Sequence, residues 1–141
     1  MDLRPRPNRN RRYIIEKEDI TLQGRHIRLE PHALSHLDGL VAAAGTDAAL
    51  YRWSPVPQSR EQAASYIDTA LSWKKAGTAV PFATVRLKDG LVIGSTRFFD
   101  IACWAWPEGN PFHDRKSPDV CEIGYTWLTR SALRTGANSE A

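Results

Sequence analysis

The residues best suited to bind an anion lie at the end of the sequence, where Arg134-Thr135-Gly136-Ala137-Asn138 follows an apolar segment. A strand that ends in such a turn and opens a helix presents unpaired backbone N–H groups at the positive end of the helix dipole. These groups bind phosphate without needing a lysine. Gly136 permits close backbone approach, and Asn138 tolerates left-handed conformations. Taken alone, the pattern also fits an ordinary turn between a strand and a helix.

Two side chains capable of proton transfer, Glu122 and Tyr125, lie just upstream in a predicted strand over residues 120–128. A carboxylate can accept a proton and a phenol can donate one. Strand geometry predicts that the side chains of Ile123 and Tyr125 alternate with those of Glu122 and Gly124 across the sheet. The alternative interpretations are a solvated or salt-bridged strand end for Glu122 and a core or rim position for Tyr125.

A metal site or a thiol nucleophile is not favoured. Cys103, Cys121, His113 and Asp114 lack a close C-x-x-C spacing and include a single histidine. Two cysteines are too few for a disulfide scaffold, so both are predicted to be free thiols packed as small hydrophobes.

Two helices are predicted near the middle of the chain. Leucines and alanines at helical spacing occupy residues 34–44, and Gly45 supplies a stop. Ser59 and Gln62 match a capping box that opens a helix ending at Gly77. Three histidines flank the first helix and are expected to face solvent or cap backbone groups: His26, His32 and His36.

Strands fill most of the remaining chain. Period-two apolar residues predict a strand pair or bent strand over 20–29, and Lys88-Asp89-Gly90 predicts a tight turn between strands 82–87 and 91–99. Residues 102–119 are expected to be irregular. The order is strand, helix, helix, strand, strand, strand and incipient helix, which predicts an α/β fold with a mixed sheet.

The net charge of +3 is concentrated in the first twelve residues, which contain five arginines and one aspartate. Residues 1–20 are therefore predicted to form a basic, mobile arm, either a solvated tail or an electrostatic arm for RNA. The rest of the chain is slightly acidic, so nucleic-acid binding by the folded body is not favoured. No apolar run approaches the roughly 20 residues that span a bilayer, and no secretory signal is evident, which makes a cytoplasmic protein the default expectation.

Four segments in this order resemble the GCN5-related N-acetyltransferase superfamily, and the most similar branch contains the ribosomal-protein alanine acetyltransferases. The segments are Leu22–Pro31, Val92–Arg97, Glu122–Leu128 and Arg134–Ala141. The resemblance covers nearly everything after residue 20. It implies that residues 21–141 are the N-terminal part of an acyl-CoA N-acyltransferase fold, with the C-terminal half absent.

The resemblance implies acetyl-CoA as cosubstrate, no metal, and direct attack by a primary amine of a protein N-terminus or a small molecule. The cofactor-binding residues it implies are Trp127, Leu128 and Thr129 for the pantetheine arm, and Arg134, Thr135, Gly136, Ala137, Asn138 and Ser139 for the pyrophosphate. Glu122 would accept the proton of the amine, and Tyr125 would protonate the thiolate.

The chain departs from the Gln/Arg-x-x-Gly-x-Gly/Ala pattern of the family at Leu133 and Asn138, although Arg134 could supply positive charge. Trp104, Trp106 and Phe112 could form one wall of the acceptor pocket or only cap the sheet edge.

A different class of function remains open: a non-catalytic binding or assembly module, or a remnant, whose basic arm binds RNA or an acidic partner. A homo-oligomer or a complementing fragment would supply the missing wall of the cofactor cleft. The chain alone is expected to show little turnover.

Overall fold

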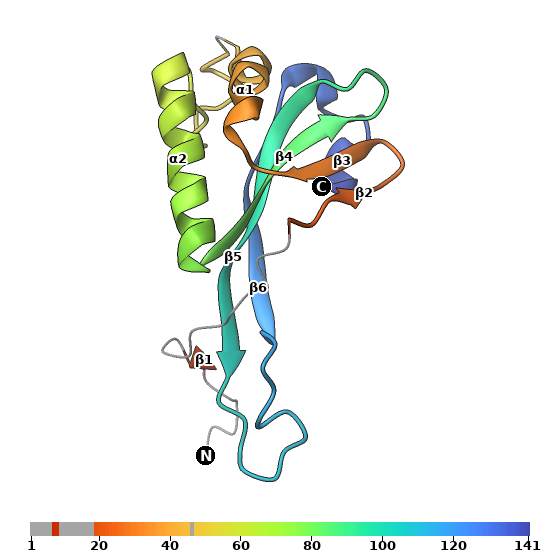
Figure 1. Cartoon of the computed structure of the whole chain (residues 1–141). Helices are drawn as coiled ribbons and strands as arrows, with labels where there is room; N and C mark the ends of the chain where they lie inside the picture. Colours follow the sequence, from red (N-terminus) through yellow and green to blue (C-terminus); the bar gives the residue numbers. More distant parts are fainter. Residues whose placement is uncertain (1–6, 9–18, 46) are drawn as a thin grey trace.

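The computed structural model describes residues 7–8, 19–45 and 47–141, which form an antiparallel sheet with helices on both faces (Figure 1). The strands are β1 (Pro7–Asn8), β2 (Leu22–Gln23), β3 (Ile27–Pro31), β4 (Ala79–Arg86), β5 (Val92–Trp104) and β6 (Val120–Leu128). Strands β2 to β6 are neighbours in chain order, and β1 pairs with the far end of β5. The predicted α/β fold is confirmed. Most of the predicted arm, residues 1–6 and 9–18, lies outside the described residues.

The turns between the strands follow the sequence signals. The predicted strand pair is β2 and β3, closed by a hydrogen bond of 2.9 Å from the Gly24 amide to the Ile27 carbonyl oxygen. The turn between β4 and β5 contains Gly90 at φ +70°, whose amide donates to the Arg86 carbonyl oxygen at 2.8 Å. Strand β5 continues to Trp104, five residues past the predicted end.

The helices are η1 (Leu34–His36), α1 (Leu37–Ala44), α2 (Arg60–Ala76), η2 (Arg130–Ala132) and α3 (Ala137–Glu140). Helix α2 begins where predicted, with Ser59 Oγ accepting the Gln62 N–H at 3.1 Å. The Gln62 side chain reaches back one residue further than a capping box requires, because its Oε1 accepts the Gln58 N–H at 2.8 Å. Gly77, at φ +72°, ends the helix.

Two apolar clusters hold the helices to the sheet. Leu40, Ile67 and Trp127 are buried between one face of the sheet and helices α1 and α2. Phe82 and Ala137 belong to the cluster on the other face, under α3. The two clusters place the turn before α3 and the helix α2 on opposite sides of β6.

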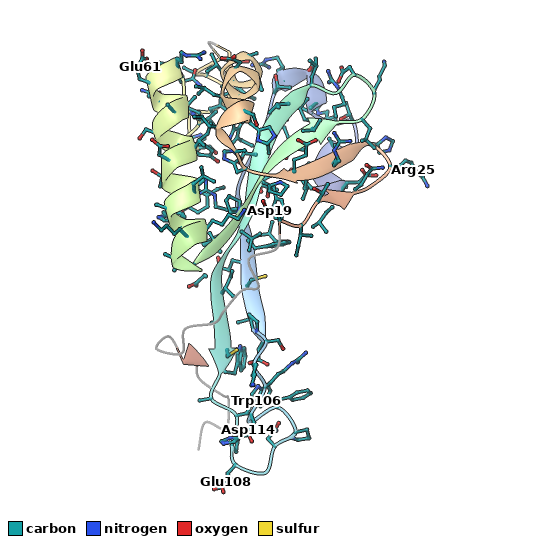
Figure 2. The ribbon with its side chains drawn as sticks, in the orientation of Figure 1. Asp19, Arg25, Glu61, Trp106, Glu108 and Asp114 are labelled. Carbon is teal, nitrogen blue, oxygen red and sulfur yellow. The ribbon has the colours of Figure 1, made fainter. Side chains whose placement is uncertain are left out.

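Strands β5 and β6 extend past the body of the molecule as a long hairpin, with Trp106, Glu108 and Asp114 near its far end (Figure 2). Trp104 and Trp106 stack with ring centroids 6.1 Å apart, and Phe112 lies 5.5 Å from Trp106. Asp119 Oδ1 accepts the Trp106 indole N–H at 3.2 Å. These three rings therefore pack on one another along the hairpin, which favours the second of the two interpretations left open by the sequence, a cap on the edge of the sheet.

Both cysteines are free thiols, as predicted, but only Cys103 is buried; Cys121 is exposed and does not pack in a core. The part of the chain that the structure describes has no helix long and apolar enough to cross a membrane.

Candidate functional site

A β-bulge interrupts β6 at its centre. Arg97 of β5 pairs with Gly124, whereas Ser95 pairs with Trp127, so β6 carries one extra residue between these positions. Tyr125 lies at this extra position and adopts φ +53°. Such a bulge sets two consecutive side-chain positions against one residue of the partner strand. Gly124 and Tyr125 therefore both face Arg97.

The bulge overturns the predicted alternation along β6. Ile123 pairs with Phe98 and lies on the α3 face, whereas Tyr125 packs edge-on against Phe99 at 5.2 Å on the α2 face. Directly opposed residues share a face of the sheet. Because Glu122 pairs with Phe99, it lies on the same face as Tyr125, and its side chain is exposed.

Arg97 is buried among three aromatic rings. Its Cζ lies 4.4 Å from the ring centroid of Tyr125, 5.0 Å from that of Tyr66 and 5.1 Å from that of Trp73. The residue is 2% exposed, and among the described residues its Nε has no hydrogen-bond acceptor. Ring faces attract a guanidinium, but they supply no counter-charge.

A cavity of about 400 Å³ opens between α2, the loop before it and the bulge. Its lining comprises apolar loop residues, polar residues of α2, and the aromatic rings with Arg97: Pro55, Val56, Pro57, Gln62, Ser65, Tyr66, Thr69, Trp73, Arg97 and Tyr125. A neighbouring cavity of about 270 Å³ shares Tyr66 and Tyr125 with it. Both cavities belong in the size range of small-molecule sites or just below it.

His32 is a buried neutral histidine beside this aromatic group. Its ring lies 5.9 Å from that of Tyr66, and both ring nitrogens are without a partner among the described residues. Burial lowers the pKa of His32 to about 3, with smaller contributions from His36 and Arg97. The expectation that His32 faces solvent or caps the backbone is therefore wrong. His36 does cap, since its Nδ1 accepts the Ala33 N–H at 3.1 Å.

The turn before α3 leaves consecutive amides free. Gly136 adopts φ +85°, and the amides of Ser139 and Ala141 donate within the turn and helix. The amides of residues 134–138 donate to no backbone acceptor outside α3 among the described residues, and the first residues of a helix have no acceptor within it. The segment is neither extended nor paired, which is the condition that an anion site here requires.

Glu140 ties this turn to the β2–β3 turn. Its carboxylate accepts the backbone N–H groups of Arg25 at 3.0 Å, His26 at 2.8 Å and Ile27 at 3.1 Å. These three hydrogen bonds hold the pKa of Glu140 below its usual value of 4.5, and the bond from the His26 amide contributes most. No local pattern predicts this contact, because it joins residues more than a hundred positions apart.

Basic side chains gather beside the same turn. A cavity of about 610 Å³ is lined by Thr135 and Ala137 together with basic residues in and beside the β2–β3 and β4–β5 turns, namely Arg25, His26, Arg86 and Lys88. Arg86 is held by Asp89, with Nη2 2.6 Å from Oδ2. The remaining basic groups make this surface suitable for phosphate. These basic groups were not predicted as part of the site, because no local motif connects them to Gly136.

The outer edge of β6 presents the Leu128 amide near the bulge. The Thr129 amide donates to the Ile93 carbonyl oxygen at 2.7 Å, so it points toward β5. Successive residues alternate between the two edges of a strand. The Leu128 amide therefore points away from β5, on the edge where the Tyr51 hydroxyl donates to the Leu128 carbonyl oxygen at 3.0 Å. Of the three predicted pantetheine residues, Leu128 presents its amide to the free edge, whereas Trp127 and Thr129 do not.

No group of three His, Cys, Asp or Glu side chains within residues 7–8, 19–45 and 47–141 could hold a metal ion.

The family model described as an acetyltransferase (GNAT) domain matches residues 26–141. A search of curated proteins finds no sequence match. Among solved structures, a GCN5-related N-acetyltransferase from Brucella melitensis superposes with a TM-score of 0.66 at 25% identity, covering 87% of this chain and 51% of its own.

Two more distant structures share the fold. RimL, a ribosomal protein acetyltransferase solved in complex with coenzyme A, gives a TM-score of 0.61 at 17% identity, over 86% of this chain and 63% of its own. FdhC, described as a nucleotide-linked sugar GNAT, gives 0.58 at 17% identity, over 87% and 61%. The chain thus spans about half to two thirds of the length of these structures. Since the two act on different acceptors, the shared fold does not identify an acceptor here.

Proposed function

The chain belongs to the GNAT acetyltransferase family, and from that premise we propose that it serves acetyl transfer from acetyl-CoA to a primary amine by direct attack. The observation that carries the proposal is the run of free amides around Gly136, at the end of a strand whose pairing is broken by the Tyr125 bulge. Free amides at a strand–helix turn fit a diphosphate. The amine would belong to a small molecule or to a protein N-terminus.

The residues present fit coenzyme A in two places. The amides of Arg134, Thr135, Gly136, Ala137 and Asn138 would hold the pyrophosphate, with the Ser139 hydroxyl beside them. The cationic side chains of Arg25 and Lys88 line the adjoining cavity and would neutralise phosphate charge, and His26 lines it beside them. The Leu128 amide would bind the pantetheine arm.

The bound thioester would supply the acetyl group, and side chains on the α2 face would accept and donate the protons. Glu122 and Tyr125 share that face, on either side of the position where Gly124 opposes Arg97. Glu122 would accept a proton from the amine, directly or through water, and the Tyr125 hydroxyl would protonate the thiolate. The rings of Tyr66, Trp73 and Tyr125 would exclude bulk water from the amine.

Calorimetric titration with coenzyme A tests the proposal, and a panel of primary amines with acetyl-CoA tests the reaction by thiol release. We expect saturable coenzyme A binding that weakens with salt, because phosphate contacts are charge-assisted. Folded protein, verified by circular dichroism, that shows no saturable coenzyme A binding would sink the proposal.

A further inference from the structure

Arg97 is a buried positive charge without a counter-charge in the part of the chain that the structure describes. It is 2% exposed, it forms no ion pair with a described residue, and its Nε is unpartnered. Removing a guanidinium from water is costly, and contact with aromatic rings offsets only part of that cost. Burial of such a group is explained if the guanidinium binds a ligand of opposite charge.

The described residues around Arg97 do not compensate its charge. His32 lies close enough to feel it, and that ring is neutral at physiological pH. Glu122 shares the sheet face but makes no ion pair with Arg97. The three rings around the guanidinium all line the 400 Å³ cavity, as does Arg97 itself. The cavity is therefore a small aromatic chamber with a fixed positive charge in its wall.

We propose that Arg97 binds a carboxylate of the acceptor, so that the acceptor is a small amine bearing a carboxylate; this rests on the acetyl-transfer function proposed above. A planar guanidinium matches a carboxylate in geometry and binds it through two parallel hydrogen bonds. Ser65, Thr69 and Gln62 of α2 add polar groups to the same cavity. The amine of such a molecule then reaches toward Tyr125 and Glu122 while its carboxylate stays at Arg97.

The test compares an acid and its amide as probes, N-acetylglycine and N-acetylglycinamide, followed by NMR. The Trp73 indole N–H resonance, assigned with Trp73→Phe, reports on the cavity, as does the Arg97 Nε–H resonance. We expect saturable shifts with N-acetylglycine and at least tenfold weaker binding of the amide. Arg97→Gln abolishes the discrimination, and Arg97→Lys weakens it, because an ammonium lacks the planar fork.

Arg115→Gln is the matched control, since Arg115 also lies over an aromatic ring, Phe112, but in the distal hairpin. This variant should bind both probes as the unmodified protein does. Equal shifts by acid and amide, absence of saturable shifts with either, or tighter binding of inorganic phosphate would overturn the proposal. If Arg97→Gln fails to fold, the comparison of the two probes on the unmodified protein decides alone.

A coenzyme A titration of the same samples separates the two proposals. Coenzyme A binding without carboxylate discrimination rejects the role of Arg97 and leaves the acetyl-transfer function standing. Loss of saturable coenzyme A binding in the unmodified protein rejects the function itself.

Discussion

The carboxylate of Glu140 occupies the space that Gly24 leaves by having no side chain: a Cβ at Gly24 would lie 2.5 Å from Glu140 Oε2. The three amides that Glu140 accepts belong to the residues that follow Gly24. Helix α3 is thereby tied by its last residue to the β2–β3 turn, while Gly136 at its start lies against His26. The free amides of the candidate phosphate site are held in place by a contact at the opposite end of the helix.

Glu140→Gln is predicted to lower the melting temperature at pH 7 and to weaken coenzyme A binding by about fivefold, because a neutral acceptor binds N–H groups less strongly. The folded-state pKa of Glu140 is depressed, so its contribution is complete above the usual value of 4.5 and is lost as pH falls through the folded value. Thermal unfolding from pH 7 to pH 3 should show the gap between the two proteins closing below about pH 4.5.

Glu108→Gln is the control for this substitution, since Glu108 is exposed at the tip of the distal hairpin (Figure 2). It should change neither the melting temperature nor the affinity. A gap for Glu140→Gln that stays the same size from pH 7 to pH 3 would contradict an electrostatic role for the carboxylate.

Gly136→Ala is predicted to raise the Kd for coenzyme A about tenfold, which corresponds to roughly 1.4 kcal/mol. The physical reason is the backbone: Gly136 adopts φ +85°, which an alanine avoids, so the turn relaxes and its amides no longer converge. A Cβ there would lie 3.6 Å from His26 Cδ2, an ordinary contact, so the fold should survive. Calorimetry at constant salt gives the affinity.

Gly109→Ala matches this variant closely, because Gly109 has φ +82° and open space around it, but lies in the distal hairpin. The same backbone strain there should leave the affinity for coenzyme A unchanged. Equal affinities for the two variants would remove Gly136 from the cofactor site.

Much of the fold is predictable because the residues that begin and end its helices and close its turns act locally. Ser59 and Gly77 fix the ends of α2 through their own backbone conformations, and Asp89-Gly90 closes the β4–β5 turn. Strand β1 was not predicted, since two residues carry no periodicity and they pair with residues of β5 that are far away in the sequence. The extension of β5 to Trp104 was missed for a similar reason, since it depends on pairing with β1 and β6.

The candidate site divides in the same way. The turn at Gly136 was predicted from one local segment and has the expected free amides. The bulge at Tyr125 was not, because an extra residue becomes visible only once β6 is registered against β5. Arg97 lies in one of the segments that resemble the family, but its burial depends on rings from α2 and β6 that no local pattern connects.

His32→Phe is predicted to remove a pH dependence of stability. Above its usual pKa of 6.5, His32 is neutral in the folded and the unfolded chain, and its contribution to stability is complete. As pH falls, the unfolded chain takes up a proton that the folded protein refuses until about pH 3, so unfolding becomes easier. The loss between pH 7 and pH 5 should be about 2 kcal/mol, which urea unfolding can measure.

The exposed His113 supplies the control, as His113→Phe should leave the loss between pH 7 and pH 5 in place. At pH 7, His32→Phe should be no less stable than the unmodified protein, because it removes two unpartnered nitrogens and keeps an aromatic ring beside Tyr66. The prediction would be contradicted if the stability of His32→Phe and that of the unmodified protein changed equally with pH.

Glu122→Gln addresses the reaction itself, once the amine panel has supplied an acceptor. Glu122 is exposed on the face that carries Tyr125 and Arg97, where it can reach an amine whose carboxylate is held at the Arg97 guanidinium. Loss of a general base lowers turnover by about a hundredfold or more, whereas coenzyme A binds through the turn at Gly136 and should keep its affinity. Raising the pH should partly restore the turnover of the variant, because a larger fraction of the amine is then already neutral and needs no base.

Glu108→Gln again serves as the control. If turnover of Glu122→Gln equals that of the unmodified protein at every pH, the amine loses its proton to solvent, and the α2 face acts by positioning alone.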